Sequence, residues 1–301
     1  MILPEYDSVL WKVDSRSPSI FSSMNRILAI SNQKGGVAKT TTALNISGAL
    51  VLQGYKVLLV DLDPQANATT ALGYIPYELN TSISEVLLGQ IPIHAAAIIH
   101  HSLPLLHVIP ANDLLIELPH HLHVTPKHHF ILRTIVEAQS SDLSYDYIIF
   151  DCPPAMNILT INALCAAHDV IIPLQTEFFA LEGLRALLQS IYHIKNNLSE
   201  RLEILGILLT MVGKNTLCQE ICAQTHHHFP NLTFGAEIPR SVTIPEAQSH
   251  GQVVQQYAPK SRCSQAYNRL STEVLFRTGR IASLPSKETS FIWQNPNLEE
   301  A

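Results

Sequence analysis

A loop of glycine, lysine and threonine carries the clearest chemical signal in the 301-residue chain. It follows a short apolar segment and reads Ser31-Asn32-Gln33-Lys34-Gly35-Gly36-Val37-Ala38-Lys39-Thr40-Thr41-Thr42. Backbone N–H groups of such a turn converge on an anion together with those of the helix that follows. Lys39 adds a positive charge for the β- and γ-phosphates, and Thr40 adds a hydroxyl for Mg²⁺. The loop therefore predicts a site for a phosphate group with Mg²⁺.

The spacing of this loop departs from the usual P-loop, which places glycines at positions 33 and 38. This chain has Gln33 and Ala38 there. A methyl group at position 38 restricts the backbone and could crowd a phosphate oxygen, so it would weaken nucleotide binding. A glycine-rich turn that joins a strand to a helix, with its lysines on the surface, is the alternative interpretation.

Three aspartates, Asp61, Asp63 and Asp151, stand at or just after the ends of apolar segments. Carboxylates at such places can hold Mg²⁺ or its bound water, and we expect Asp151 to act through a water molecule. Aspartate and proline are also ordinary in the turn after a strand. That alternative stays open for all three, and most of all for Asp61.

The segments around these residues predict a strand, a helix and a second strand. Residues 26–31 and 56–61 are short, continuous apolar runs, and a helical stretch beginning near Lys39 joins them before Gly54. Together they have the size of one βαβ unit. Ser82 and Glu85 have the spacing of a capping box at the start of a further helix.

Further apolar runs extend this pattern through most of the chain. They lie at 105–109, 147–151, 170–172 and 204–209, with a helical stretch over 180–197. Strands that are apolar without alternation are typical of a sheet covered on both faces. We therefore predict an α/β fold in a single domain, with a doubly wound, mostly parallel sheet flanked by helices and its ligand at the carboxyl ends of the strands.

Five segments, in the same order, resemble motifs of the ParA/MinD superfamily over about residues 24–280. The loop is similar to the deviant Walker A motif K-G-G-x-G-K-T-T, with Lys34 as its extra lysine. The other segments are 60–69 (V-D-x-D-P-Q-G-N-A-T), 151–154 (D-x-P-P), 177–184, and 238–240 with 245–251 (I-P-R followed by E-A-x-S-H-G). Within the superfamily, the chromosomal and plasmid partition ATPases are the most similar group.

The resemblance implies a P-loop NTPase fold and an ATPase that uses ATP and Mg²⁺. It implies that Lys34 contacts the nucleotide of a second subunit in an ATP-sandwich homodimer and that Asp63 orients the attacking water. Lys34, Lys39 and Asp63 are then the catalytic residues, and Thr40 and, through water, Asp151 hold the metal. The ATP-binding residues would be Lys34, Gly35, Gly36, Val37, Ala38, Lys39, Thr40, Thr41, Pro239 and Arg240.

The same resemblance implies non-specific DNA binding by the dimer, stimulation by a ParB-like partner, and a cytoplasmic, nucleoid-associated location. Two arginines of similar family members are missing here, since the chain has Gly213-Lys214-Asn215 and Thr243 in those segments. A basic stretch over 255–287 contains six Lys or Arg residues against Glu273 alone. The candidate DNA-binding residues are Lys214, Lys260, Arg262 and Arg269, and a solvated helix face is the alternative. Arg240, too, could be a solvated surface cation.

Composition limits the other classes of protein. A net charge of −6 argues against coating nucleic acid by overall charge. Five scattered cysteines predict reduced thiols rather than a disulfide framework, and no apolar run is long enough to span a bilayer. The chain ends with a proline and two glutamates, which does not favour an amphipathic membrane anchor. The fifteen histidines lack the spacing of a catalytic zinc site.

We divide the chain into an N-terminal extension (1–23), a ParA-like ATPase domain (24–280) and a polar C-terminal tail (281–301). Met24 resembles a usual family start, so we expect either that translation begins there or that an unstructured extension precedes the domain. Two other functions stay open. One is a nucleotide-switched positioning protein that acts on a protein scaffold rather than DNA, and the other is an ATP-dependent metabolic ligase on the same fold.

Overall fold

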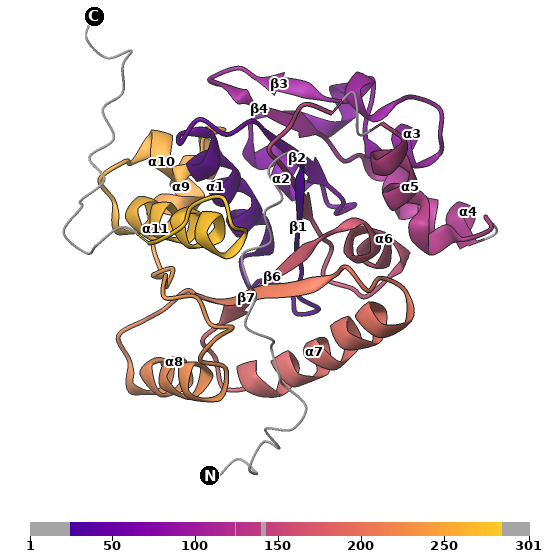
Figure 1. The fold of residues 1–301 in the computed structure, drawn as a ribbon. Helices are drawn as coiled ribbons and strands as arrows, with labels where there is room; N and C mark the ends of the chain where they lie inside the picture. The colour runs from indigo at the N-terminus through magenta and orange to yellow at the C-terminus, as the bar shows by residue number, and fades with distance from the viewer. Residues whose placement is uncertain (1–24, 124, 140–142, 285–301) are drawn as a thin grey trace, which may run out of the picture.

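The computed structural model describes residues 25–123, 125–139 and 143–284. Its centre is a seven-stranded sheet in the order β3-β4-β2-β5-β1-β6-β7 (Figure 1). The strands are β1 (Arg26–Ile30), β2 (Val57–Asp61), β3 (Ile98–His100), β4 (Leu103–Ile109), β5 (Tyr147–Asp151), β6 (Asp169–Gln175) and β7 (Glu203–Thr210). All pairs are parallel except β3 with β4. The predicted mostly parallel, doubly wound sheet is confirmed.

Helices cover both faces of this sheet. α1 (Lys39–Val51) packs with α11 (Arg262–Arg277) on one face, next to α9 (Thr243–Ser249) and α10 (Val254–Tyr257), as Figure 1 shows. α5 (Ile131–Ala138), α6 (Ile158–Ala166) and α7 (Ala180–Asn197) contribute to the apolar core on the other face. The remaining helices are α2 (Asn67–Ala71), α3 (Ile83–Leu87), α4 (Leu118–His123) and α8 (Thr216–His228).

The apolar runs form strands because each of their faces meets a helix layer. Every residue of β2 and β5 is buried, and alternate side chains enter opposite cores. The capping box before α3 is also confirmed. Ser82 accepts a hydrogen bond from the backbone of Ser84, and its backbone N–H donates to Glu85.

Some parts differ from the sequence-based expectation. β3 forms an antiparallel edge that the sequence did not predict, and β4 begins at Leu103 rather than at Leu105. The polar tail beyond residue 284 and the extension over 1–23 lie outside the described residues. No helix among the residues that the structure describes is both long and apolar enough to cross a membrane.

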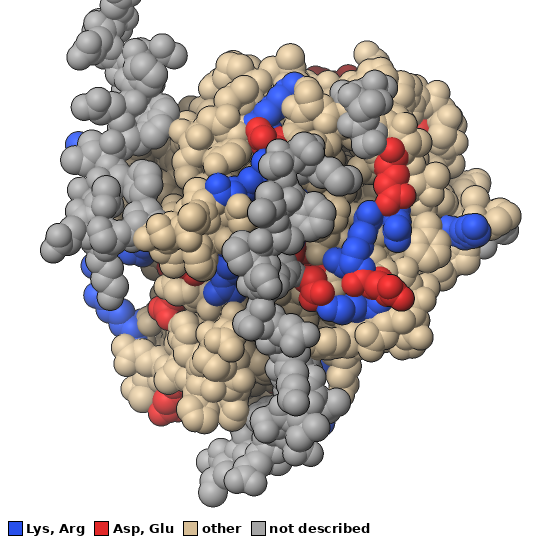
Figure 2. All heavy atoms as spheres, in the orientation of Figure 1, with Lys and Arg blue, Asp and Glu red and all other residues tan. Residues whose placement is uncertain are grey.

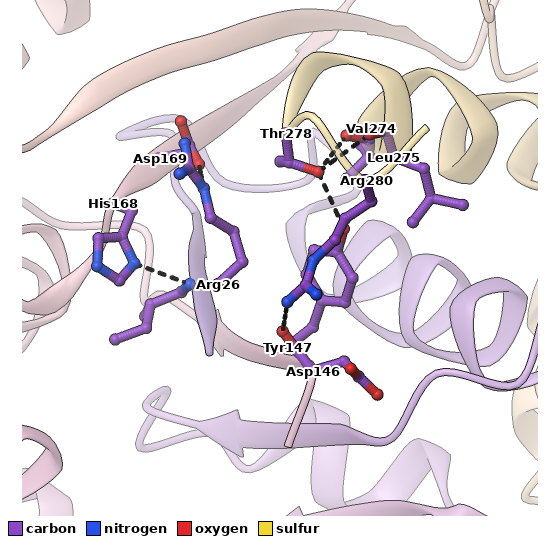
Figure 3. Close-up of polar contacts among 10 residues, drawn as sticks. Arg26, Asp146, Tyr147, His168, Asp169, Val274, Leu275, Thr278 and Arg280 are labelled. Atoms are coloured by element: carbon purple, nitrogen blue, oxygen red, sulfur yellow. Dashed lines mark hydrogen bonds and ion pairs between the residues drawn. The ribbon is translucent and has the colours of Figure 1, made fainter. Parts of the chain in front are cut away.

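A polar network ties α11 to the amino edge of the sheet (Figure 3). Tyr147, at the start of β5, bonds Thr278 through their hydroxyls at 2.9 Å. Arg280 donates to the carbonyl of Asp146 at 3.4 Å. Nearby, Arg26 pairs with Asp169 at 2.5 Å, which joins β1 to β6. This edge therefore has a structural role, and the carboxyl edge is left for ligands.

Candidate functional site

The loop between β1 and α1 lies at the carboxyl edge of the sheet, and its neighbours hold it in place. The Asn32 side chain donates to the carbonyl of Pro173 in β6 at 2.7 Å and accepts from the backbone N–H of Lys34. The Thr210 hydroxyl at the end of β7 donates to the carbonyl of Val37 at 3.1 Å. Contacts with β6 and β7 thus fix the position of the loop.

The N-terminus of α1 is open to an anion. Its N-cap residue, Ala38, makes no side-chain hydrogen bond, and the first turn contains no acidic residue. The first N–H groups of a helix have no partner within the helix, so they can bind a phosphate here. Ala38 itself is left-handed, with φ 68°, a conformation that favours glycine.

Lys39 is buried inside this loop. Its ammonium donates to the carbonyl of Lys34 at 3.0 Å, and its side chain has little contact with solvent. Burial lowers the pKa of Lys39, while the charges of Asp151 and Asp63 act in the opposite direction. The ammonium is therefore placed among the backbone groups of the loop, and its contact with a phosphate stays a prediction.

Asp151, at the end of β5, is completely buried, and neither carboxylate oxygen has a hydrogen-bond partner in the described part of the chain. Burial and the charge of Asp61 raise the pKa of Asp151 well above its usual range, while the charge of Lys39 acts in the opposite direction. A buried carboxylate without donors is costly unless a cation satisfies it. Hard cations such as Mg²⁺ take oxygen ligands and keep several waters, so these residues fit Mg²⁺.

Asp61 and Asp63 have different roles. The Asp61 carboxylate accepts bonds from the backbone of Asp63 and from the backbone and hydroxyl of Thr69, at 3.1, 2.9 and 2.7 Å. Asp61 therefore fixes the turn between β2 and α2, which was the alternative to metal binding for this residue. Burial raises the pKa of Asp61 to about 6. Asp63 accepts from the backbone of Gln65 through one oxygen, at 3.0 Å. Within the described part of the chain its other oxygen has no such bond and can meet a ligand at the carboxyl edge.

Lys34 does not point into its own loop. Its ammonium lies 2.9 Å from Glu177 Oε2, in the segment that follows β6, and the two side chains are 47% and 53% exposed. The sequence placed Glu177 in a family motif but assigned it no role. Only the packing of the loop after β1 against the loop after β6 brings the two residues together.

Pro239 and Arg240 lie beside the end of β7. Pro239 pairs with Val212, and the backbone N–H of Arg240 donates to the carbonyl of Val212 at 3.1 Å. Cys263, at the start of α11, contacts the Pro239 carbonyl through sulfur at 3.6 Å. This segment therefore connects the end of β7 to the beginning of α11.

Exposed cations lie along this connection, and we call them the basic rim. No ion pair involves them within the described ranges, and Arg269 follows Arg262 two helical turns further along α11. The rim consists of Lys214, Arg240, Lys260, Arg262 and Arg269. It includes all four residues that the sequence singled out for DNA.

The larger basic stretch over 255–287 needs correction. Arg277 donates to the carbonyls of Leu205, Leu232 and Thr233 at 2.8–3.1 Å, and its guanidinium lies 4.2 Å from the centre of the Phe234 ring. Arg280 is part of the amino-edge network described above. Lys287 lies outside the described residues. Arg277 and Arg280 therefore serve the fold, and the charge available to a ligand is smaller than the sequence suggested.

Several other charged residues form ion pairs. Figure 2 shows basic and acidic side chains next to one another on one face of the molecule rather than in separate fields. Ion pairs of this kind join Arg133 and Arg201 to Glu137, and Lys195 to Glu203. Among the described residues no group of three His, Cys, Asp or Glu could hold a metal ion, so the histidine groups form no such site there.

Comparisons with known proteins agree with this geometry. The AAA domain family model matches residues 25–204. The chromosome partitioning protein ParA of Caulobacter vibrioides is 44% identical over 253 residues, which are 84% of this chain and 94% of that protein. The chromosome-partitioning ATPase Soj of Thermus thermophilus is 40% identical over 253 residues, 84% of this chain and 96% of that one.

A solved structure supports the binding of ATP and Mg²⁺ at this kind of site. It is a Mycobacterium smegmatis protein described as cobyrinic acid a,c-diamide synthase, with an ATP analogue and magnesium bound. It is 34% identical with a TM-score of 0.74, and the match covers 86% of this chain and 98% of that one.

Proposed function

This chain belongs to the ParA/MinD family of P-loop ATPases, and we propose that it is a partition ATPase that forms an ATP-sandwich dimer and then binds DNA. The observation that carries the proposal is the combination of an open helix N-terminus, a buried lysine and an unsatisfied carboxylate at one edge of the sheet. These three features match the backbone donors, the cation and the metal-binding acid that a Mg-triphosphate requires.

Each residue of the site has a role that follows from its position. The N–H groups from Gly35 to Thr41 would bind the phosphates, and Lys39 would neutralise their charge. Thr40 would ligate Mg²⁺, and Asp151 would hold one of the metal's water molecules. Mg²⁺, when bound, neutralises charge that develops on the phosphate oxygens. Asp63 would orient the attacking water through its free carboxylate oxygen.

Lys34 would complete the site across a dimer. Its side chain leaves its own loop and reaches the surface, where a second subunit could present a triphosphate. The proposal predicts that Lys34→Ala stays monomeric in saturating Mg-ATP and that Asp63→Ala accumulates an ATP-bound dimer. Size-exclusion chromatography with light scattering, together with ATPase rates, tests both. A monomeric Asp63→Ala protein in saturating ATP would contradict these roles.

DNA is the proposed ligand of the dimer, and the basic rim supports this choice. Exposed cations that meet phosphates bind duplex DNA without reading its sequence. We expect salt-dependent retention on arbitrary duplex DNA with ATP but not with ADP. No retention at low salt would favour the alternative, a positioning protein that acts on a protein scaffold. A ParB-like partner that stimulates hydrolysis, and a location on the nucleoid, belong to the same proposal.

A metabolic ATP-dependent synthase is a second candidate, since the Mycobacterium smegmatis neighbour is described as one. Such an enzyme needs a pocket for its acid substrate beside the triphosphate. A cavity of about 350 Å³ does lie next to the Asp63 turn, lined by Gln65, Ala66, Pro76, Tyr77, Leu79, Asn112, Asp113 and Leu114. It contains Asp113 and no cation, so it does not suit a carboxylate substrate. ADP release that requires an acid and an amine donor would support the synthase instead.

A further inference from the structure

The ammonium of Lys34 is already engaged within its own subunit. It lies 2.9 Å from Glu177 Oε2, so that the loop after β1 is joined to the segment after β6. The other oxygen of Glu177 accepts a hydrogen bond from the Gln175 side chain. Both carboxylate oxygens are therefore in use, and Glu177 is held in the position where it meets Lys34.

The backbone around Lys34 does not depend on this ion pair. Asn32 binds both the Pro173 carbonyl and the Lys34 backbone, and the Gln33 side chain donates to the Ser190 hydroxyl at 3.2 Å. These contacts keep the loop against β6 and α7 when the Lys34 side chain moves. Release of Lys34 from Glu177 therefore requires rotation of one side chain rather than rearrangement of the loop.

The ion pair is also easy to exchange. Its two side chains are about half exposed, and water screens such pairs. Directly after Glu177, the rings of Phe178 and Phe179 are 62% and 68% exposed and 5.0 Å apart. The pair thus stands beside an exposed apolar surface, where an approaching subunit would remove water from both.

We propose that Glu177 is an internal competitor that holds Lys34 in the free subunit, and that Lys34 leaves Glu177 for the triphosphate of a second subunit. This inference rests on the proposed sandwich dimer. A triphosphate carries more negative charge than one carboxylate. It therefore binds the Lys34 ammonium more strongly than Glu177 does once the subunits exclude water. Until then only subunits with Lys34 free can dimerise, and because both partners must be free, the apparent dissociation constant rises as the inverse square of that fraction.

The test compares dimer dissociation constants of full-length wild type and Glu177→Gln with a non-hydrolysable ATP analogue and Mg²⁺, by sedimentation velocity. Glutamine keeps the size of the side chain and removes the charge. Because both subunits give up an exposed ion pair, we expect Glu177→Gln to dimerise roughly 2- to 30-fold more tightly. Rising salt should reduce this difference, since it weakens the ion pair in the wild type.

Glu182→Gln is the matched control. Glu182 is an exposed carboxylate in the first turn of α7, and no contact with Lys34 involves it. Its removal changes the net charge equally and should leave the dissociation constant unchanged. Monomer affinity for the nucleotide, measured by calorimetry below the dimerisation range, should be the same in all three proteins.

The outcomes separate this inference from the proposed function. A wild-type dimer with an unchanged or weaker Glu177→Gln dimer overturns the competitor role alone. A wild-type protein that stays monomeric with the analogue overturns both. Addition of Glu177→Gln to Lys34→Ala should leave the protein monomeric, because the residue for which Glu177 competes is gone. A double variant that dimerises with the analogue would also overturn the competitor role.

Discussion

The position of Asp151 lowers the stability of the protein without nucleotide, but it suits the binding of a cation together with the nucleotide. Its carboxylate is buried at the end of β5, neither oxygen has a hydrogen-bond partner among the described residues, and Asp61 adds a second negative charge nearby. Burial of a charge without a partner lowers the stability of the fold. The cation that we propose for this site, rather than packing, explains the residue.

Asp151→Asn should be more stable than the wild type when no nucleotide is present. The folded pKa of Asp151 lies above its unfolded value, so the stability that its protonated form contributes is lost as the pH rises through the folded pKa. We expect a gain of about 1–3 kcal/mol in the free energy of unfolding near pH 8 and a smaller gain near pH 4. Urea unfolding at both pH values measures this. A less stable variant near pH 8 would mean that the carboxylate has a partner.

Ala38 is strained in its left-handed conformation, with φ 68°. Ala38→Gly should raise the free energy of unfolding by about 0.5–1 kcal/mol, because relief of the strain exceeds the added entropy of the unfolded chain. Ala186→Gly, at an exposed helical position in α7, should instead cost about 1 kcal/mol. Parallel urea titrations compare them. Equal destabilisation by both substitutions would show that Ala38 is not strained.

At the scale of elements, hydrophobic periodicity and the order of the motifs predicted the buried strands and α1. The buried strands and α1 were expected because continuous apolar runs need helices on both faces. β3 was missed since its three residues carry no periodic signal, and it pairs only because β4 lies alongside. Arg277 was misread because its acceptors, the carbonyls of Leu205, Leu232 and Thr233, are distant in sequence. For the same reason no pattern linked Lys34 to Glu177.

His168 couples the edge of β6 to β1 in a way that depends on pH. Its Nδ1 accepts from the backbone N–H of Ile27 at 3.1 Å, so the ring must be neutral. Burial and the charges of Arg201 and Arg26 lower the pKa of His168 to about 4. The unfolded state therefore binds more protons between about pH 6.5 and pH 4, and stability falls as the pH falls through that window.

His168→Asn should remove this part of the acid sensitivity. The asparagine oxygen can still accept the Ile27 bond, but it does not titrate. Between about pH 7 and pH 4.5 the variant should lose about 1–3 kcal/mol less stability than the wild type. Thermal unfolding across that range measures it, with exposed His193→Asn as the control. The buried His100, whose pKa is also about 4, keeps its own contribution in both. Identical pH profiles for wild type and His168→Asn would contradict the assignment.

At the scale of the whole molecule, the net charge of the chain and the local charge of the basic rim have opposite signs. The chain is acidic overall, with a net charge of −6. Yet the basic rim consists of five exposed cations in the segments after β7 and along α11, and none of them forms an ion pair within the described ranges. A dimer would present two basic rims to one DNA molecule. Its affinity for DNA would therefore exceed that of a single subunit, which has one rim.

Substitutions of Lys260 and Arg277 should have different effects, because Lys260 belongs to the basic rim and Arg277 stabilises the fold. Lys260→Ala removes one phosphate contact per subunit, so the slope of log affinity against log salt should become less steep by about 1.8 for a dimer, with unfolding unchanged. Arg277→Met removes the guanidinium donor from three carbonyls, of which that of Leu232 keeps the backbone N–H of Ile207, and should cost about 1–3 kcal/mol of stability, while the salt slope of the folded protein stays the same. Fluorescence anisotropy over a salt series, with urea unfolding alongside, measures both. If Arg277→Met altered the slope and Lys260→Ala did not, DNA would contact the end of α11 rather than its beginning.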